Sequence, residues 1–128
     1  MVTSNSFQFN IADSGAGIYL DRSSGYIARN SIVHNEASYH GGGVHIRSSS
    51  SRVENNNIIS NTAIVGGGGL GIDGHSWPTV CNNTIADNAV GVHGGAVYIE
   101  GAAPRLINNM IIRNASSALG GGIYVENA

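Results

Sequence analysis

The most constraining feature of this chain is a pair of asparagines, five residues apart, that recurs at an almost constant interval. A large apolar residue lies between the two members of each pair. The five pairs are Asn5/Asn10, Asn30/Asn35, Asn56/Asn61, Asn83/Asn88 and Asn109/Asn114. Self-similarity at a fixed period in this range is the sequence signature of a solenoid. The 128-residue chain is therefore expected to be one structural unit copied about five times.

Two further columns of residues keep the same register. A glycine-rich run leads into Ile18, Val44, Leu70, Val97 and Ile123, which are spaced by 26, 26, 27 and 26 residues. An apolar residue also precedes each asparagine pair by three positions, at Val2, Ile27, Val53, Val80 and Leu106. Chance composition does not keep three columns in one register, so each copy has about 26 residues.

The local pattern indicates strands rather than helices. In segments 18–21, 44–47, 70–73, 97–100 and 123–126, branched aliphatic residues alternate with other residues. Strict alternation is typical of a strand with one buried face, and no window shows the 3.6-residue stripe of an amphipathic helix. About 26 residues have room for three short strands and three turns, and stacked copies pair at about 4.8 Å. The sequence predicts a single all-β domain, residues 1–128, folded as a parallel β-helix of about five coils.

The asparagine columns are assigned to this scaffold. At a tight turn asparagine tolerates left-handed backbone angles, and its amide both donates and accepts hydrogen bonds. Stacked asparagines can therefore bond to one another and to the turn backbone, which satisfies groups that would each cost roughly 1–3 kcal/mol if buried unpaired. We expect all ten asparagines of the five pairs to form a structural ladder.

The glycine and asparagine motifs together resemble a known class of repeat. GGGV at 41–44, GGAV at 94–97 and GGGI at 120–123 alternate with FQFN at 7–10, IVHN at 32–35 and IADN at 85–88. These segments resemble the GGA[ILV] and FxxN repeats of chlamydial polymorphic outer-membrane proteins. More broadly, they resemble the right-handed β-helices of the pectate-lyase-like superfamily. The resemblance covers essentially the whole chain and implies a right-handed coil.

The same resemblance implies a location and a role. It implies a bacterial, extracellular or cell-surface passenger or adhesin-like stalk, or else a carbohydrate-active β-helix. The sequence has no signal peptide, and it begins and stops within the repeat without a polar capping segment. Bare terminal coils invite pairing with other chains. We therefore expect an uncapped solenoid or a fragment of a longer one, and homo-oligomers formed by end-to-end or edge stacking.

Composition excludes several classes of function. Only 11% of the residues are charged and the net charge is −2, which argues against a nucleic-acid partner. No apolar run approaches the length of about 18 residues that a membrane span requires. The single cysteine, Cys81, cannot form an internal disulfide, and we interpret it as an ordinary free thiol.

The outward face of the strand after each glycine run is the best candidate for a ligand surface. Its alternation predicts one exposed file of Tyr19, His45, Gly71, Tyr98 and Tyr124 and a second of Asp21, Arg47, Asp73, Glu100 and Glu126. Stacking would make Asp73, Glu100 and Glu126 near neighbours beside two tyrosines. The candidate binding residues are Tyr19, Tyr98, Tyr124, Asp73, Glu100, Glu126 and, in a slightly longer connection, Trp77.

Three interpretations of this acidic, aromatic-edged strip remain open. It can simply solubilise a sheet face, it can bind sugar or Ca²⁺ through the carboxylates, or Asp73, Glu100 and Glu126 can act in catalysis. Paired carboxylates suit retaining glycoside hydrolysis at about 5–5.5 Å and inverting hydrolysis at about 6.5–9.5 Å. The connections at 21–26, 47–52, 73–79 and 100–105 have nearly equal lengths, which argues against an enzyme cleft built from long loops.

The histidines do not indicate a metal site. His40 and His93 share a column but lie two coils apart, and we expect each of the five histidines to be an exposed surface residue. A metal site needs several ligands in one shell, so none is predicted, and no cofactor is expected apart from Ca²⁺ at the acids. The sequence favours a non-catalytic, adhesin-like surface module that presents the strip to a carbohydrate or protein ligand. The alternative is a polysaccharide lyase or glycoside hydrolase-like enzyme.

Overall fold

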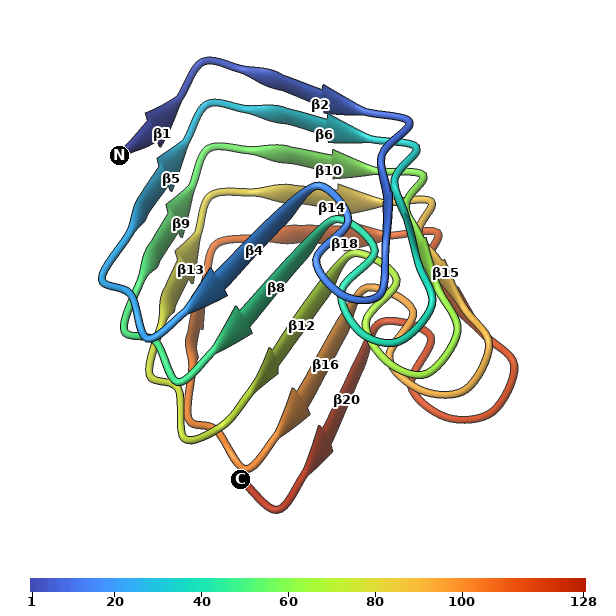
Figure 1. The fold of residues 1–128 in the computed structure, drawn as a ribbon. Helices are drawn as coiled ribbons and strands as arrows, with labels where there is room; N and C mark the ends of the chain where they lie inside the picture. Colours follow the sequence, from blue (N-terminus) through green and yellow to red (C-terminus); the bar gives the residue numbers. More distant parts are fainter.

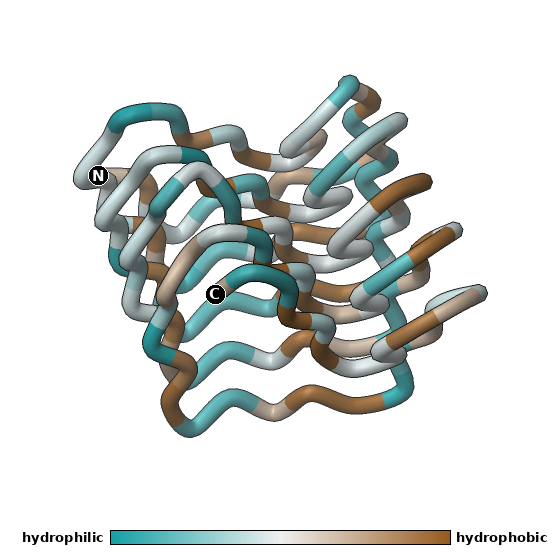
Figure 2. Tube along the Cα trace, turned by 90° about the horizontal axis from the view of Figure 1, so that it is seen from below, coloured by the Kyte–Doolittle hydropathy of each residue, from teal (hydrophilic) through white to brown (hydrophobic).

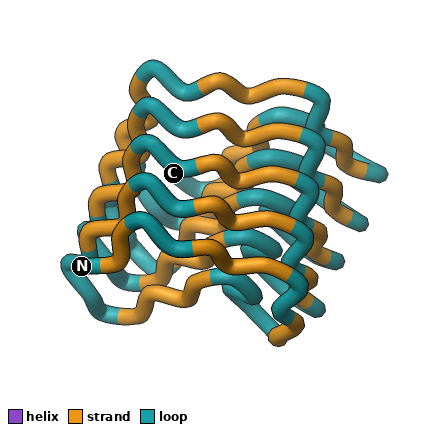
Figure 3. The backbone as a smooth tube through the Cα atoms, turned by 90° about the horizontal axis from the view of Figure 1, so that it is seen from above, coloured by secondary structure: helices purple, strands orange, loops and turns teal.

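The chain winds into a column of five stacked coils. The computed structural model describes residues 1–128 and contains strands and turns but no helix (Figure 1, Figure 3). Every strand pairs in parallel with its equivalents in the neighbouring coils, which gives four five-stranded sheets. The prediction of an all-β, parallel β-helix with about five coils of about 26 residues is confirmed.

The first two sheets flank the first asparagine of each pair. Sheet A consists of β1 (Val2–Thr3), β5 (Tyr26–Ala28), β9 (Arg52–Glu54), β13 (Thr79–Cys81) and β17 (Arg105–Ile107). Sheet B consists of β2 (Ser6–Gln8), β6 (Ser31–Val33), β10 (Asn57–Ile59), β14 (Thr84–Ala86) and β18 (Met110–Ile112). Val53 pairs with Ile27 and Val80, and Ile58 pairs with Ile32 and Ile85, so the predicted columns are in register.

The other two sheets lie on either side of the glycine-rich run. Sheet C consists of β3 (Ile11–Ala12), β7 (Glu36–Ala37), β11 (Thr62–Ala63), β15 (Ala89–Val90) and β19 (Ala115–Ser116). Sheet D consists of β4 (Ile18–Asp21), β8 (Val44–Arg47), β12 (Leu70–Asp73), β16 (Val97–Glu100) and β20 (Ile123–Glu126). Each coil thus has four strands, so the expected count of three is wrong. The strands of sheet C have two residues each, which is too short for alternation to be visible in a sequence.

The main core is an apolar column inside the coil. It is built from the inward residues of sheets A, B and D, and Ile27, Ile32, Ile58, Ile72 and Ile85 are fully buried. The hydropathy colours recur from coil to coil because equivalent positions carry similar residues (Figure 2). Burial of each such side chain stabilises the fold by about 1.5–3 kcal/mol.

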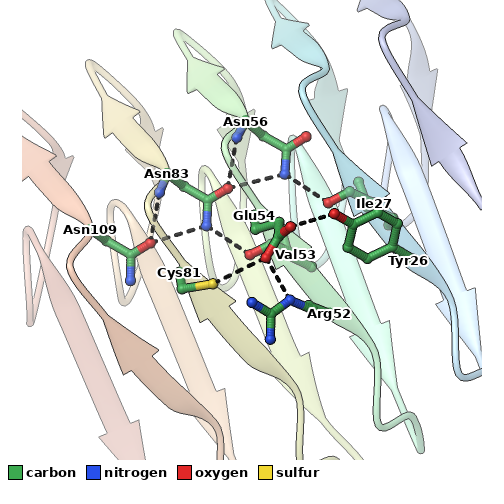
Figure 4. Close-up of polar contacts among 9 residues, drawn as sticks. All are labelled: Tyr26, Ile27, Arg52, Val53, Glu54, Asn56, Cys81, Asn83 and Asn109. Atoms are coloured by element: carbon green, nitrogen blue, oxygen red, sulfur yellow. Dashed lines mark hydrogen bonds and ion pairs between the residues drawn. The ribbon is translucent and has the colours of Figure 1, made fainter.

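The two asparagine columns form hydrogen-bonded ladders along the corners of the coil. The Asn56 backbone N–H and side-chain Nδ2 both donate to Asn83 Oδ1, at 2.9 and 3.0 Å, and Nδ2 also donates to the Ile27 carbonyl. Figure 4 shows this pattern continuing from Asn83 to Asn109. In the inner coils, both amide hydrogens and the amide oxygen of each asparagine are therefore paired, although the side chain is buried.

One detail of the predicted turn chemistry is wrong. The residue with left-handed backbone angles is the one before each ladder asparagine, as at Asn55 (φ 55°) and Ser60 (φ 56°), and no ladder asparagine has a positive φ. The ladder residue is therefore selected for its amide and not for its tolerance of strain. Arginine, serine, histidine and aspartate also fill the left-handed position.

We expect Asn61→Ala to destabilise the protein by roughly 1–3 kcal/mol, measured by urea denaturation. The Asn61 amide donates to Asn88 and to the Ile32 carbonyl and accepts from the backbone and side chain of Asn35, and the residue is fully buried. The substitution therefore leaves several buried groups unpaired.

Asn10→Ala is the matched control in the same column. Asn10 is exposed, and its side chain makes only one hydrogen bond, which it donates to Asn35 Oδ1, so a smaller loss is expected. Equal losses for the two variants, or no loss for Asn61→Ala, would contradict the structural importance of the inner rungs.

Candidate functional site

The site is created by a turn in each coil that projects beyond sheet C and then folds back over sheet D. The projecting turns are visible as a row of loops at the right of Figure 1. Ala16, Ala37, Ala63 and Val90 form a small second core beneath them. Within these turns, His40, Gly66, His93 and Leu119 form a column of parallel bridges. This column lies against the outward face of sheet D.

Because of these turns, the predicted exposed file on sheet D is largely covered. His45 is only 4% exposed and Tyr98 only 6%, whereas Tyr19 on the first coil is 45% exposed. Tyr124 is half-buried, and its ring stacks on His93 at 4.4 Å between centroids. The expectation of one open Tyr/His strip is therefore wrong for the inner coils. Alternation alone does not reveal that another segment will fold over the outward face.

Two glycines make room beneath the turns. A Cβ at Gly66 would lie 2.7 Å from the Tyr98 ring, and a Cβ at Gly71 would lie 3.3 Å from His40 Cβ. Other coils have serine, histidine, leucine or tyrosine in these columns. The missing side chains therefore leave space in the third coil, and the rings of His40, His45 and Tyr98 occupy it.

His40, His45 and Asp73 converge in this space. His45 Nε2 lies 3.0 Å from Asp73 Oδ2, and His40 Nδ1 lies 3.5 Å from the same oxygen. The three ligand atoms are all within 4.8 Å of one another. Both imidazoles are buried, so the expectation that the histidines are exposed and do not converge is wrong for His40 and His45.

The environment of Asp73 favours its charged form. Burial opposes ionisation, but the imidazoles of His40 and His45 outweigh it and hold the pKa of the Asp73 carboxyl well below its usual range. Asp73 Oδ1, His40 Nε2 and His45 Nδ1 are buried without a hydrogen-bond partner. The cluster therefore combines a half-buried carboxylate with polar atoms that the protein itself leaves unsatisfied.

An open groove adjoins this cluster at the ends of β8, β12 and β16. Its volume is about 370 Å³, and it is lined by Tyr39, His40, Arg47, Asp73, Gly74, His75, Glu100 and Gly101. A smaller hollow of about 180 Å³ shares His75 and Gly101 with it and includes Trp77. Tyr39 and Trp77 are 55% and 64% exposed. The two hollows adjoin through His75 and Gly101, and together we call them the channel. The larger is lined mainly by polar residues, whereas four of the seven residues that line the smaller are hydrophobic, and each hollow includes one exposed aromatic residue.

The predicted acids are only partly brought together. Asp73 and Glu100 line the same groove, whereas Glu126 lies outside it and pairs in register with Glu100. The Tyr98 hydroxyl donates to Glu100 at 3.0 Å, and burial followed by this contact raises the pKa of Tyr98. The tyrosine hydroxyl thus stays protonated beside the carboxylate. Ca²⁺ binding by these acids stays a prediction.

Sequence reasoning missed Tyr39 and His75, which line the groove, and the contact between His40 and His45. It placed Arg47 in the outward file but not among the candidate binding residues. A signal was present in the two columns where glycine interrupts bulky residues, at Gly66 and Gly71. An interruption in two adjacent columns of one coil indicates a local space that neighbouring side chains fill.

The remaining titratable cluster surrounds Glu54 on sheet A. Tyr26 and Arg52 donate to its carboxylate, and Cys81 Sγ lies 3.6 Å from Glu54 Oε2 (Figure 4). Burial is the main cause that raises the pKa of the Cys81 thiol, and Glu54 adds to it although Arg52 opposes it. A buried thiol that resists ionisation is a poor nucleophile, which agrees with the interpretation of Cys81 as an ordinary free thiol.

Comparison with protein families gives a match that covers nearly the whole chain. A family model described as the right-handed beta helix region matches residues 2–128. This match indicates that the coil is right-handed. No curated protein and no solved structure matches the chain. No helix in the structure has the length and apolar character needed to cross a membrane.

We expect Gly66→Ala to destabilise the protein by about 1–3 kcal/mol, because the new methyl group would overlap the Tyr98 ring. Gly122→Ala is the control, since its Cβ would meet its nearest atom at 3.8 Å and Ala96 already occupies the equivalent position in the preceding coil. Thermal denaturation compares the two variants. Equal stability would mean that the space above Tyr98 is not needed.

Proposed function

The chain belongs to the right-handed β-helix family, and on this premise we propose that it is a non-catalytic surface module that binds a carbohydrate. The observation that supports this proposal is the channel at one edge of sheet D, which combines a polar groove with the exposed rings of Tyr39 and Trp77. The rigid stack of coils holds the channel open, and the ligand docks along it.

The chemistry of the channel suits a polyhydroxylated ligand. Of the eight residues that line the larger groove only one is hydrophobic, whereas sites for apolar ligands are lined mainly by hydrophobic side chains. Arg47 donates hydrogen bonds, and the Glu100 carboxylate accepts them. Sugar hydroxyl groups do both. The exposed rings of Tyr39 and Trp77 offer flat apolar surfaces for the less polar faces of sugar rings.

The equal, short connections between strands support binding rather than turnover. Catalytic residues are disproportionately carried on loops positioned by a rigid scaffold, and this chain has little loop material beside the groove. Glu100 is already engaged by Tyr98. The competing proposal is a polysaccharide lyase or glycoside hydrolase-like enzyme that uses Asp73, Glu100 and Glu126.

A glycan array with the wild type, Tyr39→Ala and Trp77→Ala tests the binding proposal. Truncation of an aromatic residue that anchors a ligand costs more than about 1 kcal/mol, so we expect each variant to bind at least about fivefold more weakly. Phe9→Ala is the control, because Phe9 is 72% exposed but lies at the turn after β2, away from the channel. An unselective loss across all three variants, or no glycan binding, would reject the proposal.

A polysaccharide-degradation screen on the same glycans separates the two classes. Glu100→Gln and Glu126→Gln remove charge while keeping size. Release of products by the wild type that these variants abolish would favour the enzyme, whereas binding without turnover favours the module. Binding of a protein ligand in place of a glycan would retain the module and change the ligand class.

We also propose that copies of this chain stack head to tail. The ladders have a direction: Asn5 and Asn10 leave amide oxygens free in the first coil, and the backbone N–H groups of Asn109 and Asn114 have no following rung. These two ends are complementary. Several apolar side chains of the last coil are exposed, among them Met110, Leu119 and Val125.

Light scattering of this 128-residue chain is expected to show a mass that increases with concentration. Val125→Arg should lower that mass because it places a charge on the exposed end of the stack. Ile64→Arg is the control, since Ile64 is equally exposed (57% against 55%) but belongs to the middle coil. A strict monomer at high concentration would reject the stacking proposal.

A further inference from the structure

The strongest feature that the proposed function leaves unused is the convergence of His40, His45 and Asp73. Two nitrogens and one carboxylate oxygen meet within 4.8 Å. Ligands bound tetrahedrally at 2.0–2.1 Å from a metal lie about 3.3 Å apart. The two separations from Asp73 Oδ2, 3.0 and 3.5 Å, bracket this value. The two imidazole nitrogens lie within 4.8 Å of each other, so an ion that binds all three atoms would draw the two rings closer together.

The three side chains are held in this arrangement by their neighbours. Tyr39 stacks on His40 with centroids 4.3 Å apart, the tilted Tyr98 ring lies 4.9 Å from His40, and the two imidazoles meet edge to face at 5.7 Å. Gly71 leaves the space in which the rings sit. The rings are therefore largely preorganised, which lowers the entropic cost of assembling a site.

The cluster also contains buried polar atoms that need a partner. His40 and His45 are each 4% exposed, yet one nitrogen of each ring is unpartnered, as is Asp73 Oδ1. An unsatisfied buried polar group is costly, and the structure has few others. A cation bound by His40 Nδ1, His45 Nε2 and Asp73 Oδ2 would compensate the half-buried carboxylate, and Asp73 Oδ1 would be available as a further ligand atom. The far nitrogen of each ring, His40 Nε2 and His45 Nδ1, would not contact this ion.

We propose that His40, His45 and Asp73 form a binding site for a late first-row divalent cation, Zn²⁺ in the first instance. Neither the family match nor the sequence pattern indicates this site.

The ligand set determines which class of metal fits. Imidazole nitrogen suits Zn²⁺ and its neighbours in the first transition series, whereas Ca²⁺ and Mg²⁺ require shells built mainly from oxygen. Two nitrogens out of three protein ligands therefore select against Ca²⁺. Three protein ligands leave one tetrahedral position for water or another small ligand. His40 and Asp73 also line the groove, so that position has access to solvent.

The cluster occurs once in the stack because no other pair of neighbouring coils combines histidine in the column of His40 with aspartate in the column of Asp73. The column of His40 continues as Ser14, Gly66, His93 and Leu119, and the column of Asp73 as Asp21, Arg47, Glu100 and Glu126. Only in the second and third coils do two histidines, His40 and His45, lie beside an aspartate, Asp73, with a glycine at the position between them. The proposal therefore predicts one ion per chain, and it does not depend on the groove binding a carbohydrate.

Isothermal titration of the chelator-treated chain with Zn²⁺ tests the site. We expect one equivalent to bind, and the melting temperature to rise with Zn²⁺ concentration because the ion binds the folded state. Loss of an outer partner of a metal ligand already costs about 10–100-fold in affinity. His45→Ala and Asp73→Asn remove or weaken ligands themselves and should reduce the affinity at least about 100-fold. Ca²⁺ is expected not to compete.

His93→Gln and His75→Gln are the matched controls. His93 shares the column of His40 but stacks on Tyr124 instead, and His75 lies exposed in the groove outside the cluster. Both variants should keep the wild-type affinity. Zn²⁺ binding that His45→Ala leaves unchanged, or that His75→Gln abolishes, would overturn the assignment in favour of a plain hydrogen-bonded triad.

Substitution with Co²⁺ gives a readout that does not depend on the variants folding. A site with two imidazoles and a carboxylate in tetrahedral geometry gives intense visible d–d absorption, whereas hydrated Co²⁺ in solution absorbs weakly. The wild-type chain should show the intense bands at one equivalent and lose them when Zn²⁺ is added. A spectrum identical to that of free Co²⁺ would refute the site even if every variant failed to fold.

Discussion

The whole structure depends on equivalent residues of successive coils lying directly above one another. The asparagine ladders enforce this alignment, because each inner amide bonds to the next rung and to the carbonyl of the preceding coil, as Asn83 does with Asn109 and Val53. A shift of one residue would bury unpaired amides at two corners of the coil at once. The cost of such unpaired groups fixes the register of the apolar columns, and those columns then form a continuous core.

Once the register is fixed, the surface becomes a set of columns in which one substitution changes one position of one coil. Inward positions tolerate little change, because Ile58 and its equivalents fill a closely packed interior. Outward positions are less constrained, and the glycines at positions 66 and 71 show the consequence. Removing two side chains from one coil lets residues of the coils on either side meet, so a site arises without any inserted loop.

The scaffold was predictable from the sequence, whereas most of the site was not. The asparagine spacing and the alternation after each glycine run report local geometry, so they identified the fold, the core columns and the register. The strands of sheet C carry no comparable pattern, because a pair such as Glu36–Ala37 is too short to alternate. Burial of His45 and Tyr98 follows from the turns that start at those strands, so the exposed file was predicted wrongly.

The candidate site also depends on the alignment of the coils, because its residues come from three different coils. His40 and His45 belong to the second coil, Asp73 to the third, and Tyr98, which supports His40, to the fourth. The rungs from Asn35 to Asn61 and from Asn61 to Asn88 connect these same three coils. Loss of stacking between these coils would therefore separate the carboxylate from its imidazoles. An ion held by the cluster would in turn oppose that separation, so cation binding and cohesion of the central coils are expected to reinforce each other.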